Sequence, residues 1–236
     1  MFYKLRQFEN FLLLLTLTLA NYWIWQIFSN NLILGITLLA IELGLFISIS
    51  QKRLRKKYIT ILSILVLLLF CFSIFILRDK FDQTLSTTSP TEISILDKRH
   101  GYLAGGLGSL FTNKYVLHYY KDYSMATGKY LRNIFYSLDP NLYFFRSHPR
   151  EKSGINEYNK YSPFVLPFFV IGTLSLIIYL RKYKFLIVCF IMAVIITGFI
   201  SPNYILGPVL IFPVVNIVLY LGFTIAISKI KVLSKK

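Results

Sequence analysis

Acidic residues, histidines and cysteines are all scarce in this chain of 236 residues, which has 10 Asp and Glu, three His and two Cys. Cys71 and Cys189 lie within apolar stretches, where packing is the expected role and a disulfide is not. None of the histidines is paired at the spacing of metal ligands, so the sequence predicts no metal site. The glycines of "GYLAGGLGSLF" (101–111) follow no strand and fit no nucleotide-binding fingerprint, so the sequence predicts no cofactor.

Long apolar stretches dominate the chain, 56% of whose residues are hydrophobic. A helix needs roughly 20 consecutive apolar residues to cross the hydrocarbon core of a bilayer. Six stretches are long and apolar enough, at 11–28, 32–50, 58–77, 164–180, 185–200 and 204–228. The sequence therefore predicts an all-α integral membrane protein with six transmembrane helices. Gly207, Pro208 and Pro213 predict a kink in the last of them.

Among the termini and the short connections between predicted spans, basic residues gather on one side. They occur at 4–6, 52–57, 181–184 and 229–236, whereas the turns on the other side, 29–31 and 201–203, carry no charge. This positive-inside pattern predicts that both termini are cytoplasmic and that residues 78–162 lie outside the cytoplasmic membrane. The net charge of +16 therefore reflects topology and attraction to anionic lipid, and it does not indicate a nucleic-acid partner.

The first predicted span is expected to be a retained helix. The stretch "LTLANYWIWQIF" (17–28) offers no convincing signal-peptidase site. Its aromatic residues are of the kind found at a membrane–water interface, and they are Tyr22, Trp23, Trp25 and Phe28.

The predicted organisation is three blocks: a first membrane block (1–77), an external insert (78–162) and a second membrane block (163–236). Within the insert, apolar and aromatic residues recur every three or four positions over 113–138, which predicts an amphipathic helix broken near Gly128. Basic residues interleave with its tyrosines, so the insert is expected to lie along the outer headgroups as a helical cap.

Glu42, in "LLAIELGLF" (38–46), is the one acidic residue within a predicted span. An intramembrane carboxyl is costly, which makes it a candidate functional group, for example in a small transporter. The alternative is a structural role, in which Glu42 is protonated or hydrogen-bonded to Asn21, Gln26 or Asn216 on neighbouring helices.

A basic group just before the fourth span is a candidate phosphate site. It comprises Arg146, His148, Arg150 and Lys152, and it follows the aromatic residues Tyr143, Phe144 and Phe145. Arginine binds phosphate through two parallel hydrogen bonds, and aromatic rings can flank a lipid or a sugar. Plain anchoring to headgroups explains the same pattern, so both interpretations stay open.

Residues 110–172 resemble a late segment of bacterial membrane glycosyltransferases of the GT-C class, the relatives of protein mannosyltransferases and aminoarabinose transferases. The resemblance rests on four elements in order: "FTNK" (111–114), "LDPNLYFF" (138–145), "HPRE" (148–151) and "LPFFVIG" (166–172). It implies a polyprenyl-phosphate sugar as the ligand on the outer face. Only the C-terminal portion of such an enzyme is matched.

Enzymes of this class need an aspartate in the first external loop and have about ten or more spans. Here that loop is "SNN" (29–31), which contains no acid, so no catalytic residue is assigned and enzymatic activity stays undecided.

Three functions remain open from the sequence. The first is binding of a polyprenyl phosphate or lipid headgroup, with Arg146, Arg150 and Arg99 on the phosphate and Tyr143 and Phe145 beside the lipid or sugar. The second is a non-enzymatic scaffold or assembly subunit whose insert packs on a membrane-protein partner. The third is a small transporter that uses Glu42.

Overall fold

The computed structural model describes residues 2–50, 56–87, 89–107, 113–145, 160–201 and 204–233. These residues are helical apart from turns and one isolated antiparallel bridge between Phe81 and Ile200. The α-helices are α1 (Phe2–Leu19), α2 (Tyr22–Asn30), α3 (Leu32–Ser50), α4 (Lys56–Leu77), α5 (Pro90–Leu107), α6 (Lys114–His118), α7 (Ser124–Ser137), α8 (Asn141–Phe144), α9 (Leu166–Ile178), α10 (Leu180–Thr197) and α11 (Phe212–Leu233). Short 3-10 helices lie at Arg78–Lys80, Gln83–Leu85, Pro163–Val165 and Val209–Ile211, and a π-helical segment at Tyr119–Tyr123.

Three helices of the described chain are each long and apolar enough to cross a membrane, at Leu32–Ser50, Lys57–Lys80 and Val209–Ile230. Two bent pairs, α1 with α2 and α9 with α10, raise the number to five if each pair counts as one span. This is the architecture of a multi-pass membrane protein. The six separate spans predicted from the sequence are not confirmed, because one sharp bend lies inside the predicted first span and another lies where the fourth and fifth were expected to be separate.

The bend between α1 and α2 measures 66° and lies at Asn21. Asn21 has an extended backbone, and its side chain accepts a hydrogen bond from the Trp23 N–H at 2.8 Å, which caps the start of α2. The predicted first span, 11–28, is therefore two helices joined at an N-cap.

The bend between α9 and α10 measures 115° and lies at Tyr179, whose backbone is not helical. Only one residue separates the two helices. The basic residues Arg181, Lys182 and Lys184, expected in a loop between two spans, instead lie in the first turns of α10.

The kink predicted inside the last span is instead a break ahead of it. Gly207 has a φ of 64°, which a glycine adopts without strain, and Pro208 then precedes the 3-10 turn that opens α11. Pro213 lies in the first turn of α11. Backbone N–H groups in a first turn have no partner within the helix, so proline costs no hydrogen bond there.

α9 and α11 cross with their backbones in contact. A methyl group on Gly172 would collide with the carbonyl oxygen of Val218, and one on Gly222 with that of Phe168. Small residues that allow this approach are the usual basis of helix association in membranes. Next to the crossing, the rings of Phe168 and Phe223 stack at 3.8 Å.

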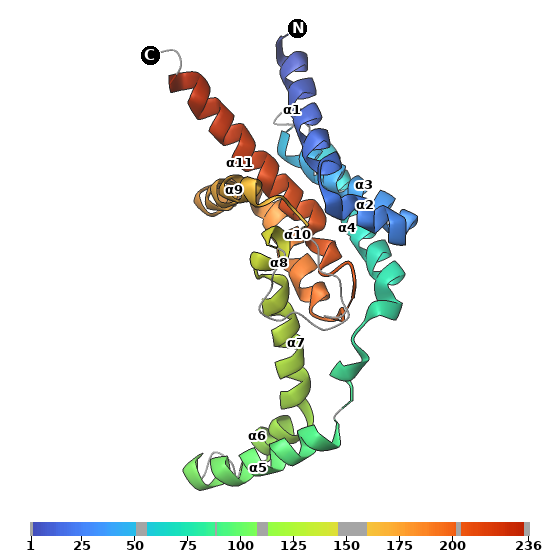
Figure 1. Ribbon diagram of the computed structural model, residues 1–236, viewed down its shortest axis with the longest axis vertical. Coiled ribbons are helices and arrows are strands. Elements are labelled where there is room, and N and C mark those ends of the chain that lie inside the picture. Colours follow the sequence, from blue (N-terminus) through green and yellow to red (C-terminus); the bar gives the residue numbers. More distant parts are fainter. Residues whose placement is uncertain are drawn as a thin grey trace.

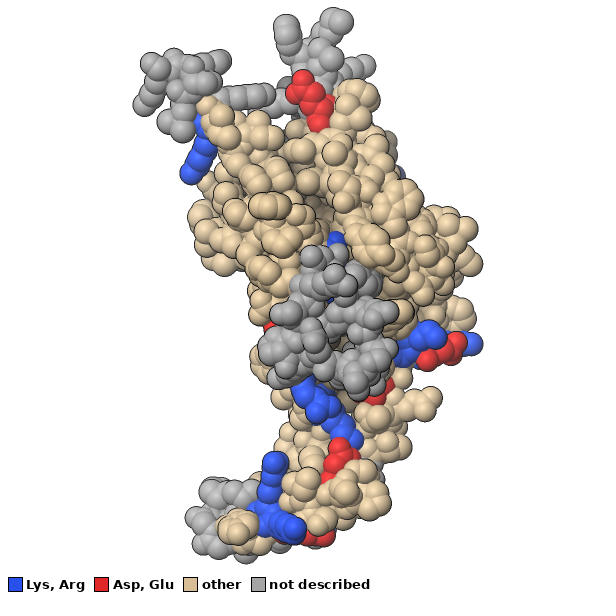
Figure 2. All heavy atoms as spheres, in the orientation of Figure 1, with Lys and Arg blue, Asp and Glu red and all other residues tan. Residues whose placement is uncertain are grey.

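The two described ends of the chain, in α1 and α11, lie at the same end of the molecule (Figure 1). On the face shown in Figure 2, the helices near this end form a broad, nearly uncharged region, and charged side chains gather at its limits and along the insert. One side of α4 is also apolar and exposed, at Ile61, Ile64, Leu65, Leu68, Phe72 and Phe75. Contact with lipid is what such a surface requires.

The insert stands away from the membrane helices. α7 runs along the long axis of the molecule, and α5 and α6 lie across its far end (Figure 1), where the Tyr120 hydroxyl donates to the Leu96 carbonyl at 3.3 Å. The predicted helix over 113–138 is thus α6, the π-helical segment and α7. Gly128 lies within an unbroken α7, so the irregularity occurs before the predicted position.

The base of the insert is fixed to the segment that follows α10. The Asp82 N–H donates to the Phe199 carbonyl at 2.8 Å, and the Ser201 N–H donates to the Lys80 carbonyl at 2.9 Å. From α7, the Tyr130 hydroxyl donates to the Ile195 carbonyl at 2.9 Å. These bonds attach the start of the insert and α7 to α10 and the residues that follow it.

Candidate functional site

Trp23 is the centre of an aromatic cluster at the start of the membrane helices. Its ring packs against those of Tyr143 (5.7 Å between centroids), Tyr161 (6.0 Å) and Phe212 (5.5 Å), and its indole N–H donates to the Leu206 carbonyl at 2.9 Å. We call these residues the Trp23 junction. It joins α2, α8, the residues before α9 and the start of α11, so it brings together segments that are up to 189 positions apart in the sequence.

Lys160 lies in this junction with only 6% of its surface exposed. Its ammonium donates to the Leu142 carbonyl at 3.0 Å and lies 5.6 Å from the centre of the Trp23 ring. A carbonyl oxygen and an aromatic face both favour a cation, which offsets part of the cost of its burial. A Cβ at position 207 would lie 3.2 Å from the Lys160 Cε, so Gly207 leaves room for this side chain.

Tyr143 and Tyr161 are paired through their backbones, because the Tyr161 N–H donates to the Tyr143 carbonyl at 2.8 Å. Phe145 and Lys160 flank residues 146–159 in the sequence. This backbone bond therefore holds both flanks at the Trp23 junction. The predicted phosphate ligands Arg146 and Arg150 belong to 146–159 and lie outside the described residues.

Of the predicted flanking residues, Tyr143 is buried and Phe145 is 42% exposed. The Tyr143 hydroxyl donates to the Ser137 carbonyl, and burial raises the pKa of this phenol far above its ordinary value. Tyr143 therefore belongs to the core of the junction, whereas Phe145 presents its ring to the surroundings.

Arg99 is exposed on α5, at the end of α7 opposite to α8 (Figure 1). α7 has 14 residues, or about 21 Å of helix, between the α5 contact and the Trp23 junction. The structure therefore does not bring Arg99 to Tyr143 and Phe145.

Glu42 is fully buried where α1, α3 and α11 meet. Its Oε1 lies 2.6 Å from the Thr18 hydroxyl, and its Oε2 accepts from the Asn216 amide at 3.2 Å. The Tyr161 hydroxyl donates to the Asn216 Oδ1 at 2.7 Å, so this polar chain reaches the Trp23 junction.

Of the partners predicted for Glu42, Asn216 is confirmed, but Asn21 and Gln26 bond elsewhere, to the Trp23 N–H and to Tyr22. Thr18 was missed, because a threonine in an apolar helix usually bonds to its own helix and so gives no signal for a contact with Glu42.

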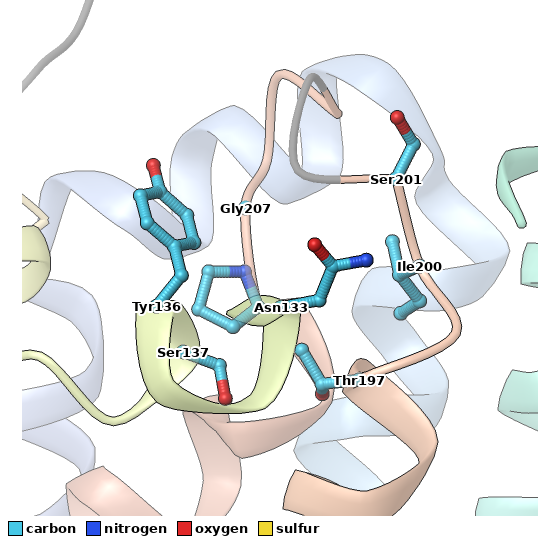
Figure 3. Close-up of a pocket in the computed structure, with 8 residues that line it drawn as sticks. Asn133, Tyr136, Ser137, Thr197, Ile200, Ser201 and Gly207 are labelled. Atoms are coloured by element: carbon cyan, nitrogen blue, oxygen red, sulfur yellow. The ribbon is translucent and has the colours of Figure 1, made fainter. Parts of the chain in front are cut away.

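A small cavity lies between α7 and the segment after α10 (Figure 3), lined by Asn133, Tyr136, Ser137, Thr197, Ile200, Ser201, Gly207 and Pro208. About 10 Å³ is open to the centre of a water-sized sphere, roughly room for one water molecule. The Asn133 amide donates to the Gly198 carbonyl at 3.2 Å, while its buried Oδ1 accepts no hydrogen bond from any described residue. An ordered water fits this oxygen.

No family model matches the chain, and no curated protein or solved structure matches it either. The resemblance to GT-C glycosyltransferases therefore stays a prediction that rests on residues 110–172 alone.

Lys129 holds the insert together with three hydrogen bonds. Its ammonium donates to the Thr84 carbonyl at 2.8 Å, the Thr87 carbonyl at 2.9 Å and the Glu92 carboxylate at 3.0 Å. Hydrogen bonds from the Ser89 N–H and from Lys129 lower the pKa of Glu92 below its ordinary 4.5. At Asp82, partial burial raises the pKa, but hydrogen bonds from Thr84 and Asn133 outweigh it and lower the pKa below 3.8.

Acid is expected to release α5 from α7. Because the folded pKa of Glu92 is lowered, its stabilising contribution is complete above pH 4.5 and is lost as the pH falls through the lowered value. Hydrogen exchange of α5 amides, corrected for intrinsic rates, should accelerate several-fold below pH 4.5 in the natural protein. In Lys129→Met, exchange should already be fast at pH 7. Slow exchange in this variant at pH 7 would contradict the role of Lys129.

Proposed function

We propose that the chain binds a lipid phosphate, that of a polyprenyl phosphate or of a phospholipid, at the outer edge of the Trp23 junction. Arg146 and Arg150 hold the phosphate, and Phe145 flanks the lipid. The observation that carries the proposal is the attachment of both flanks of 146–159 to one place, through the bonds from Tyr161 to Tyr143 and from Lys160 to Leu142. Arg146 follows directly after the exposed Phe145.

The position of the junction supports this proposal. α11 begins within it, at Phe212, and α9 begins five residues after Tyr161, at Leu166. Apolar helices that start at one level of the molecule favour a membrane boundary there, which is the level of lipid phosphates. Arginine forks recognise phosphate bidentately, whereas the buried Lys160 is engaged with a carbonyl and a ring.

Lipids that copurify with the protein in mild detergent, identified by mass spectrometry, test the proposal. A polyprenyl phosphate or one anionic phospholipid should be enriched with the natural protein and lost from Arg146→Ala/Arg150→Ala. Arg99→Ala is the matched control, since Arg99 lies at the far end of the insert, and it should retain the lipid. Only bulk lipid, unchanged in the double variant, would refute the proposal; enrichment of a polyprenyl phosphate would in addition favour the glycosyltransferase lineage.

An assembly role is the second candidate, and one specific observation favours it. α5 and α6 carry strongly exposed tyrosines at the far end of α7, Tyr102 at 87% and Tyr115 at 83%. A photo-crosslinking amino acid at Tyr115 should join one membrane protein reproducibly, while the same group at Phe75 on α4 should join lipid. Equal, diffuse labelling from both positions would remove this candidate.

A transporter that uses Glu42 has the least support, since one carboxyl oxygen of Glu42 contacts Thr18 and the other contacts Asn216.

A further inference from the structure

The hydroxyl of Thr18 has one proton and two oxygen neighbours. Its Oγ1 lies 2.9 Å from the Leu14 carbonyl, one turn earlier in α1, and 2.6 Å from Oε1 of Glu42. If Glu42 is ionised, both neighbours only accept, so one of the two short contacts has no proton between its oxygens. If Glu42 is protonated, Oε1–H donates to Thr18 and Thr18 donates to Leu14. Both contacts are then satisfied.

The remaining bonds of Glu42 agree with a neutral acid. Its Oε2 accepts from the Asn216 amide, as the carbonyl oxygen of a carboxylic acid does, and Asn216 accepts in turn from Tyr161. No described basic side chain forms an ion pair with Glu42. An ionised carboxylate buried without a cation is far more costly than a protonated one that is hydrogen-bonded on both oxygens.

We propose that Glu42, Thr18 and Asn216 form a proton-binding site inside the membrane bundle, in which Glu42 stays protonated at neutral pH and donates to Thr18. The donors then run in one direction, from Tyr161 to Asn216, to Glu42, to Thr18 and to the Leu14 carbonyl. This chain connects α11, α3 and α1, and it does not depend on lipid binding.

Few other titratable groups surround the site. Tyr161 faces it through Asn216, and the buried Tyr220 of α11 packs edge-on against Phe46, one turn after Glu42. Among the described residues of the helices packed against α3, the other titratable side chains are exposed, and they are Glu9, Tyr22, Lys57, Tyr58, Cys71 and Lys229. None is therefore placed to accept the proton of Glu42 directly.

Loss of the proton would place two acceptor oxygens, Glu42 Oε1 and Thr18 Oγ1 with its proton committed to Leu14, at 2.6 Å. The contact between α1 and α3 would then become repulsive, three residues before the bend at Asn21. The stability of the contact between α1 and α3 therefore depends on whether Glu42 is protonated. The Trp23 junction follows directly after the same bend.

Infrared spectroscopy of the full chain in lipid nanodiscs at pH 8 tests the proposal. The chain has 10 acidic residues, and a solvated Asp or Glu is ionised at this pH. A C=O stretching band of a protonated carboxyl group should therefore remain for Glu42 alone, and it should be absent in Glu42→Gln. Absence of this band from the folded natural protein at pH 8 would overturn the proposal.

Two variants distinguish the effect of protonating Glu42 from an effect on folding. Glutamine offers an N–H to Thr18 and a carbonyl to Asn216, so Glu42→Gln should melt no lower than the natural protein at pH 7, since it keeps the hydrogen-bond pattern and its folded state binds no extra proton. Raising the pH should lower the melting temperature of the natural protein only, because its folded state binds a proton that the unfolded state releases. Asn216→Ala should shift the band to higher frequency, since the carbonyl loses its donor. A band that is unchanged in this variant would exclude Glu42 as its source, even if Glu42→Gln failed to fold.

Discussion

Gly222→Ala is expected to be among the most damaging single changes in the membrane helices, although it adds only one methyl group. The added Cβ would collide with the Phe168 carbonyl oxygen and would lie 3.1 Å from the Gly172 nitrogen. Backbone atoms cannot rotate away, so α9 and α11 must separate, which opens the stacked pair Phe168 and Phe223. Overpacking of this kind costs about 3 kcal/mol or more. The melting temperature of the protein in detergent should fall by roughly 10 °C.

Gly128→Ala is the matched control for this methyl group. Gly128 also lies inside a helix, α7, but a Cβ there would meet nothing within 4 Å. Alanine is the better helix former by about 1 kcal/mol, so this variant should be at least as stable as the natural protein. Equal stability of Gly222→Ala and Gly128→Ala would show that α9 and α11 do not cross in backbone contact.

Trp23→Ala is expected to have a comparable effect by removing the centre of the aromatic junction. The side chain is completely buried, and truncating a buried tryptophan costs about 3–5 kcal/mol. The Leu206 carbonyl would also lose its donor. Because Trp23 contacts Tyr143 and Tyr161, the variant should loosen the attachment of α8, and hydrogen exchange there should accelerate along with the fall in melting temperature.

Trp25 provides the comparison, since it lies on the same helix and its indole N–H also donates to a carbonyl, that of Leu19 at 2.9 Å. It is 52% exposed, so Trp25→Ala should cost much less than Trp23→Ala. Trp23→Phe keeps most of the apolar contact and removes the N–H, with an expected cost of about 1–3 kcal/mol for the orphaned carbonyl. If Trp25→Ala proves as damaging as Trp23→Ala, the junction is not centred on Trp23.

The Glu42 site and the predicted phosphate site differ in how much of each could be predicted from the sequence. Glu42 is recognisable from the sequence because it is an acid within an apolar stretch, and Asn216 because it is an amide in another. Their pairing spans 174 positions, and no local pattern predicts such a contact. Thr18 could not be selected from sequence, since threonines in apolar helices usually bond to their own helix, as Thr16 does.

At the predicted phosphate site, residues that looked equivalent in the sequence turn out to differ in their positions. Tyr143 and Phe145 are two positions apart and looked equivalent, yet one ring is buried against Trp23 and the other is exposed. Exposure depends on which segments pack on α8, and these include α2, through Trp23, and α9, through Phe169. Arg99 was grouped with Arg146 by residue type, and α7 places it at the other end of the insert.

The sequence by itself determined the class of protein. Apolar runs of about 20 residues can only be membrane helices or a large buried core, and helices are the structures that satisfy their own backbone in lipid. The same runs left the path of the chain open, because a helix that is apolar on every side gives no periodic signal for its direction or its partners. Only the tertiary structure decided that Asn21 and Tyr179 bend the chain, that Gly172 and Gly222 allow two helices to touch, and that Trp23 rather than Trp25 is enclosed. Each of these depends on contacts between distant segments, which local composition does not encode.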